Sequence, residues 1–249
     1  MGEYSRVMNY EATILIPFLK PDVFFMKAIS SIRKSSLIDM EILLIGPADL
    51  NKGEKLFVSE ICEKSQLDFR VIFASTSNVA QALNIGLKNI ESEFIIRFDS
   101  DDIMLPSRIP NQLSYLKQNP DVVVVGGQIS LISKSGLPVI WPRIHYPTDK
   151  YELRRMMLQG CYLAHPSVTM RTEAVRSLGG YREWFNSAED YDLWLRILKI
   201  GELANLGEKV IKYRQHKNQA SRKFNDVSRF TKAALESYLG DENHKMTEF

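Results

Sequence analysis

The feature that most constrains the fold is a repeated alternation of short apolar runs and amphipathic stretches in the first hundred residues. The apolar runs are ATILIPF (12–18), MEILLIG (40–46), FRVIFA (69–74) and the stretch that begins FII at position 94. Apolar residues at helical spacing lie between these runs, in 21–36, 51–65 and 78–91. Strands that alternate with helices favour an α/β fold with a mostly parallel, Rossmann-like central sheet and helices on both faces.

The rest of the chain alternates less regularly. We predict helices over 107–118, 148–159, 172–181 and 189–201, and strands over 121–133, 165–171 and 208–216. Gly126 and Gly127, inside the first of these strands, predict a bulge or a close approach of another backbone. The last part is polar, with a weakly amphipathic stretch, VSRFTKAALESYL. The pattern therefore predicts one domain over residues 1–222 and a small C-terminal helical tail over 223–249.

Composition excludes some functions and favours a setting. The net charge of +2 is too mild to indicate a nucleic-acid partner. Cys62 and Cys161 are far apart in sequence and form no metal-type pair, so we expect buried, reduced thiols. The first residues lack the apolar region of a signal peptide, and no run of about 18 apolar residues suggests a membrane span. We expect a cytoplasmic protein.

Polar residues follow the predicted strands at their carboxyl ends, where parallel sheets collect their ligands. The densest group is Asp99, Asp101 and Asp102, directly after the strand that begins at Phe94. Aspartates in a turn can cap the next helix, which would explain one or two of the three. The alternative is a hard cation, Mn²⁺ or Mg²⁺, which takes one or two carboxylates together with substrate phosphate. Such a metal–diphosphate would relieve the repulsion between the three carboxylates.

Three further stretches leave two interpretations open. Glu189 and Asp190 either supply helix N-terminal charge or include a general base. The segment YRQHKNQAS is either a solvated basic face or a phosphate clamp, in which His216 could bind a metal. His165 is more often a structural residue than a ligand, and it precedes a proline, so we expect an extended backbone there. Arg97, Arg143 and Trp184 are weaker candidates.

Together, these stretches resemble family 2 glycosyltransferases of the GT-A fold. The resemblance rests on ILIPFLKP, on ALNIGLKNIESEFIIRFDSDDIMLPSRIPNQLSYLKQNPDVVVVGG, and on HPSVTMR, GGYREWFNSAEDYDLWLRI and YRQHKNQAS, over roughly residues 12–222. It implies an inverting, metal-dependent transfer from a nucleotide-activated sugar. The chain departs from the family after its second strand, where LIGPADLN replaces an acidic turn of the DDGS type.

The resemblance also implies residue roles. Asp101 would bind the metal, with His216, and Asp99 would contact the nucleotide. Asp190 would be the catalytic base, with Glu189 in a supporting role. Residues that would contribute to the nucleotide-sugar site are Pro17, Asp49, Asn78, Asn84, Arg97, Asp99, Ser100 and Arg214.

The leading interpretation is therefore a glycosyltransferase of surface-polysaccharide synthesis, with a UDP-sugar as the expected donor. A metal-dependent nucleotidyltransferase acting on sugar phosphates is an alternative, but no G-x-x-x-x-G-K phosphate loop is present in the sequence. A non-catalytic sugar-binding protein on the same fold is another. The acceptor would be a glycan or a lipid-linked saccharide. Phe230 and Leu235, beside Arg229 and Lys232, would let the tail rest on a membrane surface, or else pack on the domain or in a homodimer.

Overall fold

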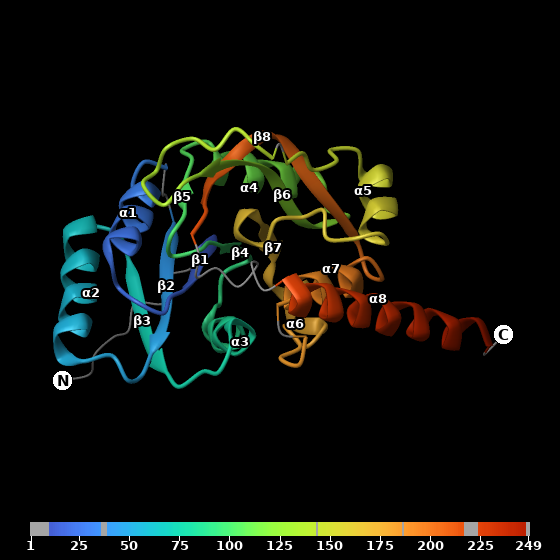
Figure 1. Ribbon diagram of the computed structural model, residues 1–249, viewed down its shortest axis with the longest axis horizontal. Coiled ribbons are helices and arrows are strands. Elements are labelled where there is room, and N and C mark those ends of the chain that lie inside the picture. Colours follow the sequence, from blue (N-terminus) through green and yellow to red (C-terminus); the bar gives the residue numbers. More distant parts are fainter. Residues whose placement is uncertain (1–9, 36–38, 143, 186, 217–223, 248–249) are drawn as a thin grey trace.

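A computed structural model describes residues 10–35, 39–142, 144–185, 187–216 and 224–247 (Figure 1). Its strands form one sheet in the order β3-β2-β1-β4-β7-β6-β8-β5. The strands are β1 (Ala12–Pro17), β2 (Met40–Pro47), β3 (Phe69–Ala74), β4 (Phe94–Arg97), β5 (Ile103–Met104), β6 (Val122–Ile132), β7 (Thr169–Arg171) and β8 (Glu202–Arg214). The helices are α1 (Val23–Ile32), α2 (Lys52–Ser65), α3 (Val79–Asn89), α4 (Arg108–Gln118), α5 (Lys150–Met157), α6 (Thr172–Ser177), α7 (Glu189–Ile197), α8 (Phe224–Thr247) and a short 3₁₀ turn, η1 (His165–Ser167).

The first half of the sheet is parallel, as the alternation predicts. β1 pairs in parallel with β2 and β4, and β2 pairs in parallel with β3. β7 then runs antiparallel between β4 and β6, while β6 pairs in parallel with β8. The predicted α/β fold with a mostly parallel sheet is therefore confirmed, with a mixed second half that the sequence pattern did not indicate.

Three elements differ from their predicted form. β8 begins at Glu202, six residues before the predicted strand, because it continues along β6 over most of that strand's length. The predicted strand over 165–171 is strand only from Thr169, and His165 lies in the 3₁₀ turn η1 rather than in extended backbone. The turn is closed by a backbone hydrogen bond of 2.9 Å from Ser167 N–H to the Ala164 carbonyl. β5 is a two-residue strand, too short for a periodicity signal.

The two glycines of β6, Gly126 and Gly127, lie where another segment approaches closely or where the strand register shifts. The β6–β8 register shifts between Gly127 and Gln128, which is the predicted irregularity. A Cβ atom on Gly126 would lie 2.7 Å from Asn205 Oδ1, too close for any side chain. The close approach lets the amide of Asn205 donate to the carbonyls of Pro147 and Tyr162, which fixes the loops at this edge.

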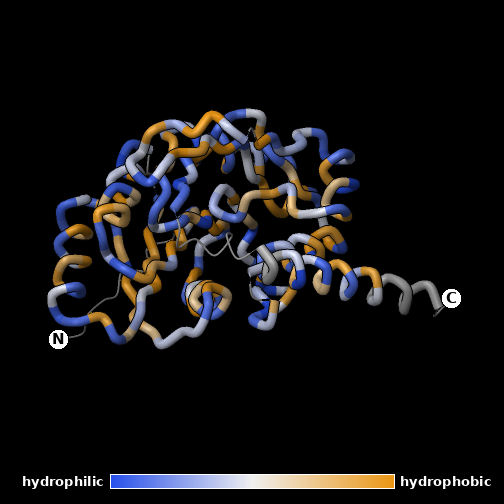
Figure 2. The backbone as a smooth tube through the Cα atoms, viewed as in Figure 1, coloured by the Kyte–Doolittle hydropathy of each residue, from blue (hydrophilic) through white to orange (hydrophobic). Residues whose placement is uncertain are grey.

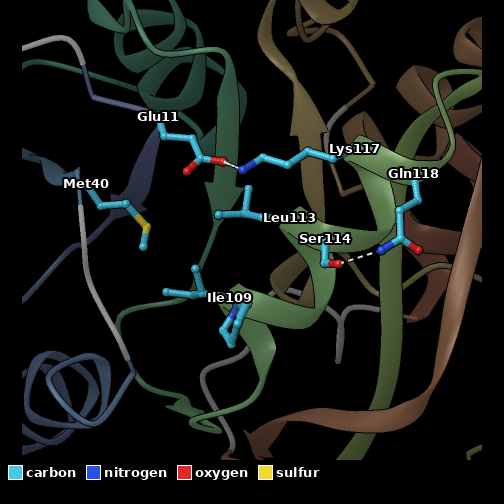
Figure 3. A pocket seen from close by; sticks show the side chains of 8 residues that line it. Glu11, Met40, Ile109, Leu113, Ser114, Lys117 and Gln118 are labelled. Atoms are coloured by element: carbon cyan, nitrogen blue, oxygen red, sulfur yellow. Dashed lines mark hydrogen bonds and ion pairs between the residues drawn. The ribbon is translucent and has the colours of Figure 1, made fainter.

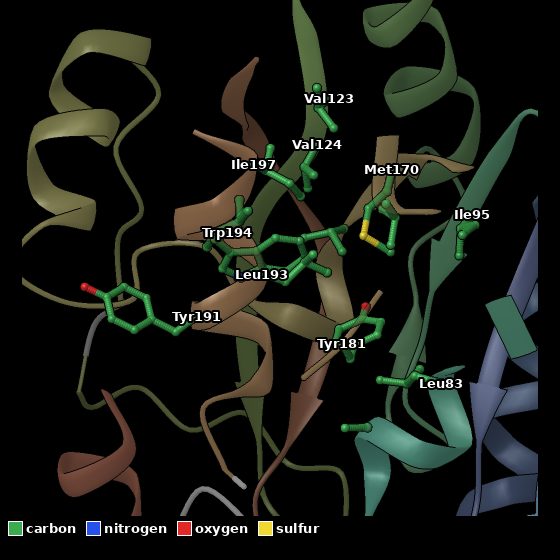
Figure 4. Packing of buried hydrophobic residues seen from close by; sticks show 14 of the residues in the cluster. Leu83, Ile95, Val123, Val124, Met170, Tyr181, Tyr191, Leu193, Trp194 and Ile197 are labelled. Carbon is green, nitrogen blue, oxygen red and sulfur yellow. The ribbon is translucent and has the colours of Figure 1, made fainter. Parts of the chain in front are cut away.

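The core consists of two apolar clusters, one on each face of the sheet. Alternate side chains of a strand point to opposite faces, so Ile95 belongs to one cluster and Ile96 to the other. Helices α3 and α7 cover the first cluster, whose tight packing is drawn in Figure 4, and α1, α2 and α4 cover the second. The central strands are correspondingly hydrophobic in Figure 2. Each face therefore presents a different set of side chains at the carboxyl edge.

The C-terminal tail packs on the domain through helix α8. Ala234 is buried in the cluster that contains α7, and Phe230 and Leu235 pack against the same cluster. Lys199 Nζ lies 4.8 Å from the ring centre of Tyr238. The apolar residues proposed for a membrane surface thus contact the protein, which supports the alternative that the tail packs on the domain. Within the described residues, no helix is long and apolar enough to cross a membrane.

The expectation of buried thiols is wrong for Cys161, which is exposed, and Cys62 is only half-buried. Cys161 lies in the turn after α5, where its Sγ contacts the Leu163 carbonyl at 3.3 Å. Both thiols are free in the structure. Neither forms part of a metal-ligating group among the described residues.

Candidate active site

The three aspartates converge at the carboxyl end of β4. Their nearest carboxylate oxygens all lie within 4.8 Å of one another, a separation that one cation can bridge. Asp101 Oδ2 lies 2.6 Å from His216 Nε2, which follows β8. Asp99 Oδ1 lies 2.5 Å from Arg97 Nη1. The structure therefore brings Asp101 and His216, the two residues predicted to bind a metal, next to each other.

Asp102 is the third and most deeply buried member of the cluster. It is fully buried, and its Oδ1 accepts a 2.7 Å hydrogen bond from the backbone N–H of Arg214. Its Oδ2 has no hydrogen-bond partner among the described residues. A buried carboxylate oxygen without a partner is costly. An oxygen-ligated cation at this cluster would supply one, so the residues present fit Mn²⁺ or Mg²⁺.

The electrostatics of the cluster also favour added positive charge. Burial, and then the neighbouring Asp99, raise the pKa of Asp101 and of Asp102. The hydrogen bond from His216 acts in the opposite direction on the pKa of Asp101. A cation would relieve the repulsion and favour the carboxylate form of both groups. The metal roles of Asp101 and His216 remain predictions.

Arg214 does not have the environment expected of a phosphate ligand. Its side chain is buried, and its guanidinium donates to three backbone carbonyls, those of Asp101 (2.7 Å), Ser133 (3.3 Å) and Lys134 (3.1 Å). It also lies 4.8 Å from the ring centre of Phe24. Arg214 therefore orders the DxD turn and ties it to the loop after β6. Lys217 and Lys223, the other cations of the predicted clamp, and the candidate Arg143 lie outside the described residues.

The other nucleotide-site candidates lie in two groups. Pro17 ends β1, and Asp49 and Ser100 follow β2 and β4, all at the carboxyl edge. Pro17 and Ser100 are half-buried, and Asp49 is exposed. Asn78 and Asn84 belong to α3 and its cap, and both use their amides within the protein. Asn78 Oδ1 accepts from the Gln81 N–H at 2.9 Å, which caps the helix. Nucleotide contacts of all five remain predictions.

Asn84 clamps the segment that leads to the second acidic pair. Its amide bonds both the N–H and the carbonyl of Tyr181, at 2.9 and 2.8 Å. A Cβ atom on Gly180 would lie 2.6 Å from Asn84 Oδ1, and Gly180 has a φ of +73°, so only glycine fits. The chain then enters α7 through Ser187, whose φ of +66° is also left-handed. These turns fix where α7 begins.

Glu189 and Asp190 occupy the first turn of α7, as predicted. Asp190 Oδ1 accepts a 2.7 Å hydrogen bond from the N–H of Tyr191. Glu189 is buried, and its Oε2 has no hydrogen-bond partner among the described residues. Asp192 serves a different purpose, because it is buried in an ion pair with Arg196 at 2.7 Å. In this turn, Asp192 therefore has a structural role in an ion pair, whereas Glu189 keeps one carboxylate oxygen that has no hydrogen-bond partner among the described residues.

Glu189 and Asp190 lie in surroundings that disfavour their ionised forms. Burial, followed by the charge of Asp190, raises the pKa of Glu189 to about 7. Burial likewise raises the pKa of Asp190, although the hydrogen bond from Tyr191 and the charge of Arg97 oppose it. A carboxylate with a raised pKa is a better proton acceptor once it is ionised. This environment suits a general base near neutral pH.

One buried residue near the site, Arg108, was not identified from the sequence. Arg108 is fully buried and donates to the carbonyls of Arg97 (2.7 Å) and Val168 (3.0 Å), and burial lowers its pKa to about 9. No sequence signal distinguishes it from a solvent-facing arginine at a helix start. His165 is structural, as expected: its Nε2 lies 3.0 Å from Tyr181 Oη, and burial lowers its pKa well below the usual range.

A separate hollow lies at the other end of the strands (Figure 3). It has a volume of about 380 Å³ and is lined in part by Glu11, which precedes β1, and Met40, which begins β2. Residues of α4, including Lys117, complete it, and Lys117 Nζ lies 2.5 Å from Glu11 Oε1. Because both strands start here, the hollow is remote from the carboxyl-edge site.

Comparison with known proteins agrees with this geometry. The family model described as "Glycosyl transferase family 2" matches residues 13–179. The O-antigen biosynthesis glycosyltransferase WbnJ of Escherichia coli is 32% identical over 202 residues, which cover 79% of this chain and 76% of WbnJ. The chain spans only 38% of two longer Rickettsia relatives, both described as uncharacterized glycosyltransferases.

Solved structures share the fold at low identity. S. aureus TarS 1–349 in complex with UDP-GlcNAc superposes with a TM-score of 0.67 and 16% identity, covering 90% of this chain and 66% of that chain. The mannosyltransferase PcManGT from Pyrobaculum calidifontis, in complex with GDP-Man and Mn²⁺, gives a TM-score of 0.64 and 13% identity, covering 87% and 60%. With the family model matching most of its length, this chain belongs to glycosyltransferase family 2 and has the GT-A fold.

Proposed function

We propose that this chain transfers a sugar from a UDP-sugar, with inversion, to a hydroxyl of a glycan or lipid-linked acceptor in surface-polysaccharide synthesis. The observation that carries the proposal is the presence of two distinct acidic groups at one site. One is the Asp99–Asp101–Asp102 cluster, with a geometry that suits a cation. The other is the Glu189–Asp190 pair, in which Glu189 is buried and its Oε2 has no hydrogen-bond partner among the described residues. In a single displacement, the first group would hold the cation at the leaving diphosphate, and the second would supply the base that activates the acceptor hydroxyl.

The donor side would use the aspartate cluster. Asp101 and His216 would hold Mn²⁺ or Mg²⁺, and the bound ion would neutralise charge on the departing nucleoside diphosphate. Asp99, fixed by Arg97, would orient the nucleotide. Complexes of fold relatives with UDP-GlcNAc, and with GDP-Man and Mn²⁺, support a nucleotide-sugar and a metal. UDP is proposed over GDP because TarS was crystallised with UDP and with UDP-GlcNAc.

The acceptor side would use Asp190 as the base. A sugar hydroxyl is a poor nucleophile until its proton is drawn off, and inversion requires that base opposite the leaving group. Glu189, the more deeply buried neighbour, would tune Asp190 by its charge. No covalent intermediate with the protein is needed in this scheme.

A relative supports the proposed acceptor class. WbnJ is described as an O-antigen biosynthesis enzyme, which supports a glycan or lipid-linked acceptor at a membrane surface. Flotation with vesicles that contain anionic lipid, with and without residues 224–249, tests whether the tail contributes to membrane contact. Size-exclusion chromatography with light scattering of the same two proteins tests the proposed homodimer.

A donor panel tests the reaction itself. The full chain is incubated with UDP-, GDP- and dTDP-sugars and Mn²⁺, and release of the nucleoside diphosphate is measured with and without EDTA. We expect slow, EDTA-sensitive release from one UDP-sugar, which a suitable acceptor accelerates. Consumption of a sugar 1-phosphate with a nucleoside triphosphate, and no release of diphosphate from any donor, would instead indicate a nucleotidyltransferase.

A further inference from the structure

The loop between β6 and α5 exposes several large apolar side chains. Leu137, Ile140, Trp141 and Ile144 all belong to it, and between 40% and 79% of the surface of each is exposed. A single exposed leucine needs no explanation, but a group of large apolar side chains on one short loop is typical of a binding surface. Figure 1 shows this loop along the upper outline of the molecule, apart from α2 and α8.

Both ends of this β6–α5 loop are attached to the domain. At the first end, the Val139 N–H donates to the Leu131 carbonyl at 2.9 Å, which folds the chain back along β6. At the second end, the Gln128 amide bonds the backbone of Tyr146 twice, donating to its carbonyl at 2.8 Å and accepting from its N–H at 3.0 Å. Trp141 lies between these two attachments, so its exposure results from a defined loop and not from a loose chain end.

The charge of the loop has one sign. The sequence of residues 133–147 contains Lys134 and Arg143 and no acidic residue, although the whole chain has a net charge of only +2. Lys134 is exposed at the start of the loop. Basic residues beside a bilayer are attracted to anionic lipid headgroups, and tryptophan is enriched where a bilayer meets water. The composition of the loop therefore complements an anionic membrane surface.

The base of the loop is joined to the proposed donor site by one side chain. The guanidinium of Arg214 donates to the carbonyls of Ser133 at 3.3 Å and Lys134 at 3.1 Å, and also to the carbonyl of Asp101 at 2.7 Å. A surface that takes up the exposed part of the loop would therefore lie near the aspartate cluster. That position suits an acceptor that is itself anchored in a lipid.

We propose that the β6–α5 loop docks the enzyme on an anionic lipid bilayer, with Ile140 and Trp141 in the interfacial layer and Lys134 at the headgroups. The proposal rests on the proposed function only for its purpose, which is to hold the enzyme where a lipid-linked acceptor lies. It places the membrane contact on this loop instead of the tail, whose Phe230 and Leu235 pack on the domain. A stable protein interface takes about 800 Å² from each partner, more than one short loop offers.

The first test asks whether Trp141 enters the bilayer. The chain has three tryptophans and Trp194 is fully buried, so Trp184→Phe leaves Trp141 as the exposed one. This protein is mixed with vesicles of phosphatidylcholine and phosphatidylglycerol, with or without bromine on the acyl chains, because bromine quenches a nearby indole. We expect lower emission with the brominated lipid, and no such loss when Trp141→Phe is added. Equal emission with both lipids would overturn the proposal.

The second test measures the contribution of the apolar side chains by flotation with the same vesicles. Leu137→Ser combined with Ile140→Ser should lower partitioning by about tenfold or more, because less apolar surface leaves water on binding. Leu56→Ser, on α2, is a matched control, since Leu56 is 61% exposed and Leu137 is 67% exposed. Leu239→Ser is the control on the tail. Both controls should partition like the wild type, and a loss with Leu239→Ser as large as that of the loop variant would contradict the proposal.

The third test concerns the charge. Lys134→Gln should weaken binding to the anionic vesicles by about fivefold, the usual contribution of one basic residue near such a surface. Wild-type binding should also fall as salt is added, because salt screens the attraction. Vesicles of phosphatidylcholine alone should bind weakly and should not distinguish Lys134→Gln from the wild type. Equal wild-type binding to neutral and anionic vesicles would refute an anionic surface as the partner.

The docking proposal and the proposed function fail in different ways. Flotation needs neither donor nor acceptor, so release of diphosphate from no donor would refute the transferase and leave the docking result unaffected. Sugar transfer by a protein that does not bind vesicles would refute the docking alone. Light scattering adds one further outcome. A dimer that Leu137→Ser combined with Ile140→Ser dissociates, in a protein that binds no vesicles, would assign the loop to a second copy of the chain and overturn the proposal.

Discussion

Asp102 and Glu189 are both buried carboxylates, and each has one oxygen without a hydrogen-bond partner among the described residues. Their surroundings differ. Asp102 belongs to a group in which every carboxylate already has a nitrogen partner, from Arg97, His216 or the Arg214 backbone. Glu189 has a carboxylate neighbour, Asp190, and its pKa is raised to about 7. The surroundings of the first group suit a cation, and those of the second suit proton exchange.

We expect the largest effect from a substitution in the first group, the aspartate cluster. Asp101→Asn should lower kcat by about 10⁴-fold or more, because the proposed cation would provide several kcal/mol of charge stabilisation to the transition state. It should also abolish Mn²⁺-dependent UDP binding, measured by calorimetry. Asp121→Asn is the control, since Asp121 is an exposed aspartate paired with Lys150 on the surface. Wild-type turnover by Asp101→Asn, together with insensitivity to EDTA, would refute the metal role.

We expect the next largest effect from a substitution in the Glu189–Asp190 pair, which leaves the aspartate cluster intact. Asp190→Asn should lower kcat by about 10²–10⁴-fold, the usual contribution of a positioned base. The affinity for UDP with Mn²⁺ should stay the same, because the donor group is unaltered. Steady-state kinetics and calorimetry on one preparation give both numbers. A variant that kept its turnover and lost its UDP affinity would assign Asp190 to the nucleotide.

We expect a smaller effect on turnover from Asp192, which lies in the same first turn of α7 as Asp190 but has a structural role. Asp192 is buried in its pair with Arg196, so Asp192→Asn leaves a buried guanidinium with a weaker partner. We expect a loss of about 2–4 kcal/mol in the free energy of unfolding, measured by urea denaturation. Turnover below the unfolding transition should change less than tenfold. A catalytic loss as large as that of Asp190→Asn would mean that the turn acts as one unit.

The smallest effect concerns pH. The pKa of Glu189 is raised in the folded protein from an ordinary value of 4.5 to about 7. Its contribution to stability is therefore fully present below about pH 4.5 and is lost as the pH rises through about 7. Glu189→Gln should remove this dependence and stabilise the protein at pH 8, relative to wild type, by about 1–3 kcal/mol more than at pH 5. Equal differences at the two pH values would show that Glu189 ionises normally.

The two regions of the sheet differ in how well their structure could be predicted. β1 to β4 are short apolar runs that alternate with amphipathic helical stretches, so their parallel arrangement and their shared carboxyl edge follow from the pattern. The first turn of α7 could be placed because an acidic pair precedes an apolar helical stripe. β5 and β7 span two and three residues, and no periodicity can indicate elements of that length.

The interior partners of the site could not be predicted, because they are backbone atoms far away in sequence. Arg214 resembles a phosphate ligand in sequence, yet its partners are carbonyls of the DxD turn and of the loop after β6. Arg108 resembles a surface residue and is fully buried. The cysteine composition likewise gave no indication that Cys161 is exposed. Burial of polar side chains depends on tertiary structure, which a single sequence pattern does not specify.

The hydrogen bond from the Arg214 N–H to Asp102 joins residues 112 positions apart. During synthesis, β1 to β4 and their helices can emerge from the ribosome and begin to pack well before this strand exists. The aspartate turn, however, lacks its backbone donor, its pairing partner for β5 and the imidazole of His216 until the chain has passed residue 216. Contacts of such long sequence separation form late. A nascent chain can therefore possess most of the sheet and still lack the assembled aspartate cluster, so the proposed donor site cannot form before His216 has been synthesised.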